Sequence, residues 1–379
     1  MDTYRPEMES EINQDLFPIP EESVEGWKEK PIRGVKQELV PLGAFTDFSA
    51  CDTSAVYFGE RGGGPEMNFS GQVLNFVGQK VNRKESFLTH FVRKDVFDRL
   101  KEAQKLLPRG HYFKFFDGYR SLAVQQELFA NQRKIIASQH STWTTEQIDE
   151  ETHKFIARPA TDEESRANRP APHTTGAAID LRLIRMNEKG QALLQELEEK
   201  KQAGKLNYEI KPEEQDAYQQ ALAWINNQKL PDDKKQNWLS EYRYGIYKAL
   251  IFRNFSETVD MGTGFDDFGK EAQTNYYETI PQDQISPDDL KRRNNRRLLY
   301  KIMNSVGFLN YPGEWWHFSY GDQEWAANKK QNAALFGEVG LSETNQAMEK
   351  ARRLAYLKTI RDVRKGDDPI FIENPDRQI

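Results

Sequence analysis

The stretch PHTTGAAIDLRL, residues 172–183, decides how the fold is interpreted, because a polar loop runs there directly into small and apolar residues. It carries His173, one of six histidines in the chain, and Asp180 follows seven residues later. Gly176 permits a tight turn, and the two alanines after it are small enough for another segment to approach closely. The spacing alone leaves two interpretations open: half of a metal site, or a polar loop that leads into a buried strand.

The composition limits the kinds of site that this chain can build. Its 379 residues suffice for one large domain or two modest ones, and 37% hydrophobic residues allow a sizeable core. The net charge of −6 is mild and spread along the chain, which argues against nucleic-acid binding, since phosphates need a clustered basic face. Cys51 is the single cysteine. A metal site must therefore use His, Asp and Glu side chains.

The sequence also bears on where the protein works. No apolar run approaches the roughly 18–20 residues that a membrane-spanning helix needs. The start, MDTYRPEMESEINQDLF, is acidic and polar, unlike a signal peptide. We therefore expect a cytoplasmic protein, or a periplasmic one if a signal peptide has been removed.

Three regions are predicted along the chain. Residues 1–41 are rich in Pro and Glu and short of large apolar residues, so we expect an extension without a core of its own. Residues 42–322 should form the main domain. Residues 323–379 should form a tail that is helical until about Arg364 and polar after it.

A long charged segment, at about residues 187–255, lies inside the main domain. We predict several helices there, broken at Gly190, Gly204 and Pro231. Because the segment separates two groups of polar site candidates, we interpret it as a helical insertion. We expect it to serve as a lid over the cleft or as a contact between subunits, while the oligomeric state itself stays open.

The rest of the main domain alternates between helical and strand patterns. Apolar spacing predicts a helix over residues 89–107, and HYFKFFDGYR predicts a strand, a turn and then a helix over residues 121–137. The remaining predicted elements are a strand at residues 177–184, a helix at 288–306 and a strand at 308–320.

The stretch GEWWHFSY, residues 313–320, indicates a functional site more strongly than PHTTGAAIDLRL does. Two adjacent tryptophans between Glu314 and His317 are improbable in a solvated loop. A regular strand would place these two side chains on opposite faces, but the Pro312–Gly313 start predicts an irregular backbone that lets both point into one cleft. We interpret His317 as a metal ligand and Glu314 as a general base that does not bind the metal. The alternative is an aromatic core that contains a hydrogen-bonded histidine.

These residues meet the requirements of one metal. Zinc in catalytic sites typically has three protein ligands from His, Asp or Glu, with water in the fourth position. His173, Asp180 and His317 would supply that number from distant parts of the chain.

Two further stretches carry candidate polar groups. DGYR at residues 117–120 places Arg120 after a turn, where it can stabilise an oxyanion or bind a carboxylate; a helix-start arginine paired with Asp117 fits equally well. GTGFDDF places Asp266 and Asp267 after a glycine-rich turn, where one of them could bind a substrate ammonium, although Asp after Gly is also ordinary turn chemistry. The other four histidines are expected to be structural or surface residues: His90, His111, His140 and His153.

In this order, the stretches resemble the VanX-type D-alanyl-D-alanine dipeptidases, zinc enzymes of peptidase family M15. The family pattern S-x-H-x-x-G-x-A-x-D reads APHTTGAAID at residues 171–180, and E-W-W-H stands at residues 314–317. Three further segments match in order and kind: NFSG at residues 68–71, MGTGFDDF at 261–268 and NNRRLLYKIMNSVGF at 294–308. The resemblance covers about residues 42–185 and 257–322.

The resemblance implies an activity and a set of roles. One zinc ion per chain would be held by His173, Asp180 and His317, and a zinc-activated water would hydrolyse a small D-amino-acid dipeptide, D-Ala-D-Ala. Glu314 would be the catalytic base, and Arg120 would stabilise the transition state at the scissile carbonyl.

The resemblance also implies how the substrate is held, and it has one departure. Asp266 would hold the free amino group, with Asp117 and Tyr119 of the DGYR turn beside the substrate. The family's serine is Ala171 here, followed by Pro172. A hydroxyl that could bind the substrate carboxylate is therefore missing, which puts strict dipeptide specificity in question.

The expected fold is α+β and D,D-peptidase/hedgehog-like: a small, mainly antiparallel sheet with flanking helices and a zinc cleft on the sheet. One rival function is a D,D- or L,D-carboxypeptidase or an endopeptidase that acts on peptidoglycan peptides, for which a more open cleft is expected. A more distant rival is a non-catalytic zinc-binding domain, which would have lost its base. The physiological purpose, whether antibiotic resistance, recycling or nutrition, stays open.

Overall fold

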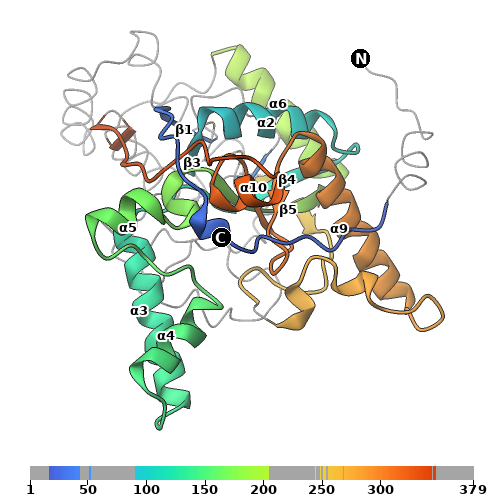
Figure 1. The fold of residues 1–379 in the computed structure, drawn as a ribbon. Helices are drawn as coiled ribbons and strands as arrows, with labels where there is room; N and C mark the ends of the chain where they lie inside the picture. The colour runs from blue at the N-terminus through green and yellow to red at the C-terminus, as the bar shows by residue number, and fades with distance from the viewer. Residues whose placement is uncertain are drawn as a thin grey trace.

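The structure is a computed structural model. It describes residues 17–42, 51–52 (backbone only), 90–204, 244, 248, 251–252, 255–267, 269–343 and 345–346. In this part of the chain, helices surround a central mixed sheet (Figure 1). No described helix is long and apolar enough to cross a membrane.

The central sheet has six strands and is mainly antiparallel, which confirms the expected α+β class. Five strands follow one another across it in the order β2, β4, β5, β8, β7, and β6 pairs with the other end of β5. Only the pairing of β2 with β4 is parallel among the described strands. The bounds are β2 Cys51–Asp52, β4 His111–Asp117, β5 Ala178–Met186, β6 Ser256–Thr258, β7 Leu309–Asn310 and β8 His317–Ser319.

Strand β5 is the centre of the sheet and separates the core from the site. Side chains alternate between the two faces of a strand. Ile179, Leu181 and Leu183 join the hydrophobic core, so the opposite face presents Asp180. The short strand predicted at residues 177–184 is confirmed and extends to Met186.

Two helices cover the core face of the sheet. They are α2 (Lys94–Lys105) and α9 (Pro287–Ser305), and apolar residues of both belong to the same core cluster. The helix predicted at residues 288–306 is confirmed; Ser286 accepts a hydrogen bond from the Asp289 N–H at its start. Gly307, with φ of 92°, ends it as expected.

The helix predicted from residue 89 is wrong at its start. Residues Phe91–Arg93 form strand β3, which pairs antiparallel with β1 (Leu39–Pro41) in a separate two-stranded sheet. All three β3 residues are buried, as their apolar character predicted. They are buried by pairing with β1 as a strand, and not as part of a helix. Helix α2 begins only after them, and the extension predicted at residues 1–41 contributes β1 to this sheet.

The tail after β8 is less helical than predicted. Helix α10 covers only Gln323–Asn328, and the prediction of a helix is wrong over residues 329–342. Lys330 adopts a left-handed φ of 53° there, which is not a helical conformation. Farther along, the backbone forms hydrogen bonds with a distant segment instead of within a helix, since Ala334 N–H donates to the Pro31 carbonyl at 2.8 Å. Residues 347–379 lie outside the described part of the chain.

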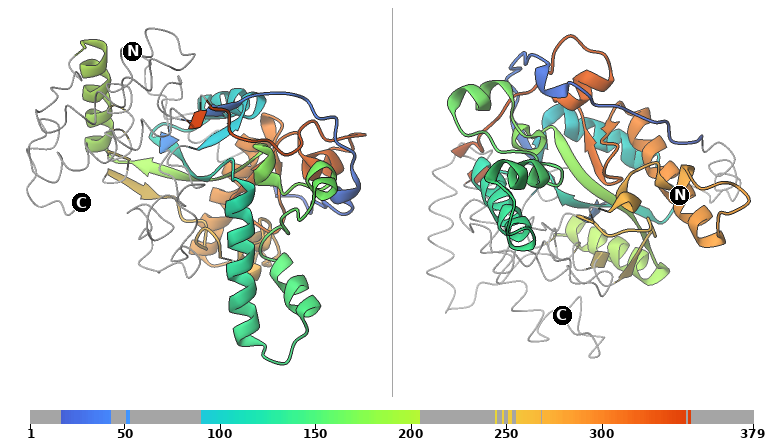
Figure 2. Two further views of the ribbon diagram at one scale, coloured as in Figure 1. Left: turned by 90° about the vertical axis from the view of Figure 1, so that its left-hand side faces the viewer. Right: turned by 60° about the horizontal axis from the view of Figure 1, so that its bottom comes forward.

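An arm of helices extends from the body of the fold (Figure 2). It consists of α3 (Leu122–Gln139) and α4 (Thr145–His153), followed by the short α5 (Glu163–Asn168). Ser121 caps α3 by accepting a hydrogen bond from the Val124 N–H, which confirms the helix predicted there. Four short 3₁₀ turns complete the described elements: η1 Trp27–Glu29, η2 Pro172–Thr175, η4 Lys270–Ala272 and η5 Tyr276–Glu278.

Helix α6 (Glu188–Gln202) opens the segment that the sequence marked as an insertion. The predicted break at Gly190 is wrong, because that glycine lies inside α6. A Cβ at Gly190 would come within 2.5 Å of the Phe255 Cβ, so the glycine permits close packing. Gly204, with φ of 67°, follows the end of the helix as predicted. Pro231 and most of the remaining segment lie outside the described residues.

Candidate functional site

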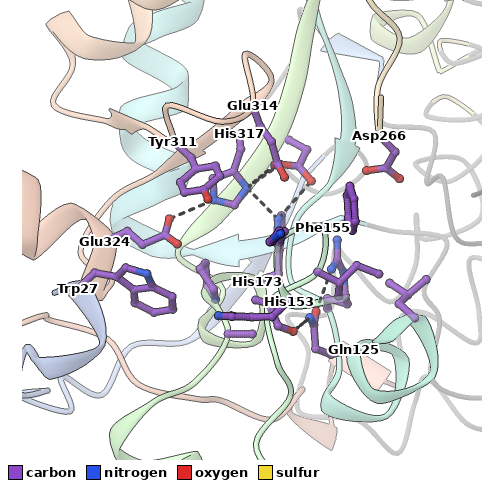
Figure 3. A pocket seen from close by; sticks show the side chains of 18 residues that line it. Trp27, Gln125, His153, Phe155, His173, Asp266, Tyr311, Glu314, His317 and Glu324 are labelled. Carbon is purple, nitrogen blue, oxygen red and sulfur yellow. Dashed lines mark hydrogen bonds and ion pairs between the residues drawn. The ribbon is translucent and has the colours of Figure 1, made fainter. Parts of the chain in front are cut away.

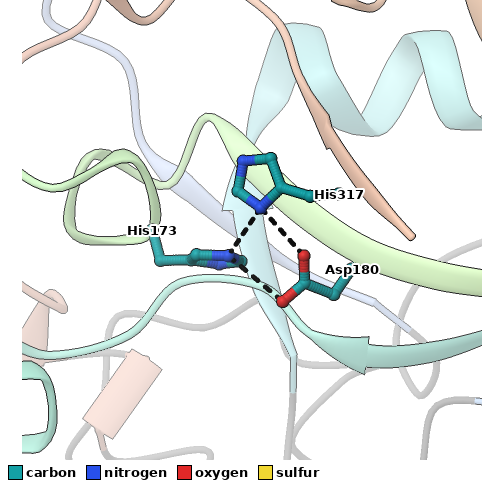
Figure 4. Close-up of side chains that lie close together, drawn as sticks. All are labelled: His173, Asp180 and His317. Carbon is teal, nitrogen blue, oxygen red and sulfur yellow. Dashed lines mark hydrogen bonds and ion pairs between the residues drawn. The ribbon is translucent and has the colours of Figure 1, made fainter. Parts of the chain in front are cut away.

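Three separate elements bring His173, Asp180 and His317 together (Figure 4). His173 lies on η2, Asp180 on β5 and His317 on β8, and all three are buried. The antiparallel register sets Asp180 directly opposite His317, and a bulge near Phe116 sets Asp117 of β4 opposite Asp180 on the other side. The sheet therefore aligns an Asp–Asp–His row across three strands.

The candidate ligand atoms of these residues are close enough to share one ion. His173 Nε2 lies 3.2 Å from Asp180 Oδ2, and His317 Nδ1 lies 3.0 Å from Asp180 Oδ1. The two ring nitrogens are 3.3 Å apart. Ligands bound about 2.0–2.1 Å from a tetrahedral zinc ion lie about 3.3 Å from one another. The spacing therefore fits a zinc ion.

The hydrogen bonding of His173 supports the same conclusion. Its Nδ1 lies 2.8 Å from the Gly118 carbonyl, which can only accept, so Nδ1 carries the proton. The lone pair of Nε2 then faces the Asp180 carboxylate. Two acceptors at this distance need a cation between them, whether a metal ion or a proton.

The electrostatics keep Asp180 ready to bind a metal. Burial works to raise the pKa of Asp180, but His173 and His317 hold it well below the usual carboxylate range. Burial works to lower the pKa of His317, but Asp180 beside it raises that pKa to about 10. A metal ion that bound to this group would therefore displace a proton from it.

The loop before β5 is held in a tight conformation. Gly176, with φ of 71°, ends η2 in the left-handed region, and a Cβ there would lie 2.4 Å from the Leu39 side chain. Arg93 of β3 fixes the same loop, since its Nε donates to the Thr175 carbonyl at 2.7 Å. These contacts hold His173 over the sheet.

Glu314 lies beside His317, although not on a continuous strand. The single strand predicted at residues 308–320 is wrong, because a turn separates β7 from β8. His317 N–H donates to the Glu314 carbonyl at 3.2 Å, and Glu314 Oε2 lies 3.8 Å from His317 Nδ1. The irregular backbone predicted around Pro312–Gly313 is present, and both side chains line one pocket. Burial raises the pKa of Glu314 to about 7, with His317 acting in the opposite direction.

The adjacent tryptophans serve the core. Trp315 and Trp316 are both fully buried and belong to the main hydrophobic cluster. Trp315 Nε1 also donates to Thr263 Oγ1 at 2.8 Å. The two interpretations of GEWWH, an aromatic core and a functional site, are therefore both correct. The tryptophans anchor the turn in the core, and the residues on either side of them face the pocket.

The Arg120 guanidinium is held in place at the pocket by Asp117 and Gln125. Its Nε donates to Asp117 Oδ2 at 2.7 Å, and its Nη1 donates to Gln125 Oε1 at 2.8 Å. Asp117 also accepts from the Gly118 N–H. Arg120 lines the pocket, whereas Asp117 and Tyr119 are not among the residues that line it. Tyr119 is buried in a smaller cluster with residues of β1 and β3.

Asp266 lies on the pocket wall, in a left-handed conformation with φ of 58°. Burial raises its pKa well above the ordinary value, and the nearby Asp180 adds to that rise. A positively charged group in the pocket would favour the ionised carboxylate. Its neighbour Asp267 is exposed and accepts from the Gly269 N–H, which is ordinary turn chemistry.

One cavity with a volume of about 140 Å³ is lined by the three candidate ligands together with Arg120, Asp266 and Glu314. That volume is below the roughly 300–1,000 Å³ of sites for drug-sized ligands, so the cavity fits a small molecule. In Figure 3, Trp27 and Glu324 lie on one side of His173 and His317, and Asp266 lies on the other.

Sequence reasoning missed several residues of the pocket wall. His153, expected to be structural or on the surface, lines it, with its Nε2 2.7 Å from Lys28 Nζ. Nothing in the spacing of the motifs indicates that η1 and the end of α4 meet here. For Glu324, one feature of the sequence could have indicated a place in the pocket wall: it follows the GEWWHFSY stretch within a few residues. The residues that were missed and line the pocket include Trp27, Gln125, His153, Phe155, Tyr311 and Glu324.

Comparison with known proteins matches part of this chain. The family model described as D-ala-D-ala dipeptidase, of peptidase family M15, matches residues 196–334. The matched range contains Asp266, Glu314 and His317, while His173 and Asp180 precede it. The range also includes much of the segment at about residues 187–255, whose status as an insertion stays a prediction.

One curated relative is a D-alanyl-D-alanine dipeptidase from Synechocystis sp. It is 44% identical to this chain over 97 residues, which make up 24% of this chain. The match covers 39% of the relative's own length.

Proposed function

We propose that this chain, whose residues 196–334 match the D-ala-D-ala dipeptidase model of peptidase family M15, hydrolyses D-Ala-D-Ala with one zinc ion per chain. The observation that carries the proposal is the convergence of His173, Asp180 and His317 in one small cavity, with Glu314 beside them. A zinc ion held there would supply a Lewis acid that lowers the pKa of water and polarises the scissile carbonyl.

Glu314 is the base in this proposal. Its carboxylate takes the proton of the attacking water and passes it to the nitrogen of the leaving amine. A half-buried carboxyl group whose pKa is raised to about 7 is suited to both steps, because it can gain and lose a proton near neutral pH.

Arg120 stabilises the negative charge that develops on the carbonyl oxygen. Replacing Arg120 with methionine should lower kcat about 100- to 1,000-fold, or about 2.7–4 kcal/mol in the barrier, the usual cost of losing one such donor. Steady-state kinetics on D-Ala-D-Ala measures this loss.

Arg133→Met is the matched control for Arg120→Met. Arg133 lies on α3 and is paired with Asp149, as Arg120 is paired with Asp117, but it does not line the pocket. Its replacement should leave kcat nearly unchanged. Equal losses in the two variants would contradict the role of Arg120.

Asp266 binds the free amino group of the substrate. Asp266→Asn should raise KM for D-Ala-D-Ala, because a neutral amide attracts an ammonium less than a carboxylate does, while Asp267→Asn should not. The two residues are adjacent, but only Asp266 lines the pocket. An Asp266→Asn variant with unchanged KM would show that the amino group binds elsewhere.

Substrate length distinguishes the proposal from its nearest rival. The small cavity favours a dipeptide, whereas Ala171 and Pro172 line the pocket without offering a hydroxyl group. We therefore expect kcat/KM to be highest for D-Ala-D-Ala in a panel of di-, tri- and pentapeptides that end in D-Ala-D-Ala. A pentapeptide cleaved faster would identify a carboxypeptidase or endopeptidase, and no cleavage of any peptide would indicate a non-catalytic zinc domain.

A further inference from the structure

The side of the His317 ring that faces away from Asp180 meets a second buried carboxylate. Nδ1 faces Asp180, and Nε2 lies 3.8 Å from Glu324 Oε2. Both Nε2 and Oε2 are buried and have no hydrogen-bond partner in the described part of the chain. Two complementary polar atoms therefore face each other, each in need of a partner.

A metal ligand needs this kind of partner. When Nδ1 of a neutral imidazole binds a metal, the proton is on Nε2, which becomes a donor that requires an acceptor. His173 already has such a partner, because its outer nitrogen lies 2.8 Å from the Gly118 carbonyl. For His317, the atom in the corresponding place is Glu324 Oε2.

The fold holds Glu324 in a fixed place relative to His317. Gly321, with φ of 85°, turns the chain from β8 into α10, which begins two residues later. Asp322 caps α10 by accepting from the Trp325 N–H at 2.8 Å and also accepts from Ser319 Oγ of β8 at 2.9 Å. The connection that carries Glu324 is thus tied to the strand that carries His317.

We propose that Glu324 is a positioning residue for the metal centre: it accepts a hydrogen bond from His317 Nε2 and so keeps His317 Nδ1 directed at the ion. The proposal rests on the metal site of the proposed function, but not on the peptide that is cleaved. A protein that binds zinc without cleaving D-Ala-D-Ala would refute the proposed function and leave this role intact.

Zinc affinity of Glu324 variants tests the proposal. Glu324→Leu removes the acceptor at similar volume, and Glu324→Gln keeps an acceptor oxygen without the charge. Competition with a chelator of known affinity should give a zinc Kd about 10- to 100-fold higher for the leucine variant and a smaller rise for the glutamine variant, the usual range for partners of metal-ligating histidines.

Glu314→Gln provides the matched control. Glu314 also lies 3.8 Å from His317, but from Nδ1, on the metal side of the ring. Its replacement removes the same charge at the same distance and should leave the zinc Kd nearly unchanged. A Glu324→Leu variant that binds zinc as tightly as Glu314→Gln does would overturn the proposal.

Two further measurements separate positioning from a merely structural role. Glu324 Oε2 forms no hydrogen bond and lies 3.8 Å from His317 Nε2, so we expect the metal-free leucine variant to remain folded, and its melting temperature is measured beside its zinc Kd. A lower melting temperature without a change in zinc Kd would identify a structural role and overturn the proposal. In the zinc-loaded wild type, NMR of the histidine rings should show a proton on His317 Nε2 that exchanges slowly with solvent, and its absence would overturn the proposal without any variant.

Discussion

His317→Ala should lose the zinc ion and, with it, all measurable hydrolysis of D-Ala-D-Ala. The substitution removes one of three ligands and leaves Asp180 facing a single imidazole, because the β5–β8 register places His317 directly opposite that carboxylate. Two protein ligands are fewer than catalytic zinc sites use. Metal content after dialysis, measured by atomic spectroscopy, should fall from one zinc per chain to nearly none.

His140→Ala controls for the loss of a histidine as such. His140 lies at the far end of the arm between α3 and α4, where its ring stacks on Trp143. This variant should keep one zinc per chain and full activity. If His317→Ala retained stoichiometric zinc while remaining folded, His317 would not be a ligand.

Glu314→Gln is expected to separate metal binding from catalysis. The amide cannot accept the proton of the attacking water, so kcat should fall about 100- to 10,000-fold, the usual contribution of a general base. Zinc content should not change, because the carboxylate lies 3.8 Å from His317 Nδ1 without belonging to the His–Asp–His group. Parallel measurement of zinc content and steady-state rate shows both effects.

Glu338→Gln is the control for Glu314→Gln. Glu338 pairs with Arg166 at 2.6 Å and does not line the pocket, so its replacement should leave the rate nearly unchanged. Substantial turnover by Glu314→Gln would rule out Glu314 as the base.

The sequence predicted most of what local chemistry determines. Strand β5 is apolar on one face and carries Asp180 on the other, so the alternation of apolar and polar side chains along it predicted both the core and the site. Helices α3 and α9 begin at serine caps and were placed within one or two residues. The grouping of His173 and Asp180 with His317 came from motifs in a known order, since no local signal joins residues so far apart.

What the sequence did not predict depends on contacts between distant segments. Residues 91–93 were assigned to a helix because their apolar pattern continues that of α2, but pairing with β1 determines their conformation. The pocket wall formed by Trp27 and His153 depends on how η1 and the end of α4 are packed against the site. Glu324 acquires its place only through the turn at Gly321. Each of these cases is a tertiary effect that overrides or supplements local preference.

The central claim is that a zinc ion bound by this chain is required for the hydrolysis of D-Ala-D-Ala. The direct measurement is the rate of D-alanine release by the purified protein before chelation, after chelation and after the return of one equivalent of zinc. The rate should fall to background in the chelated protein and recover when the zinc is restored. Unchanged hydrolysis by protein shown to be free of metal would contradict the claim.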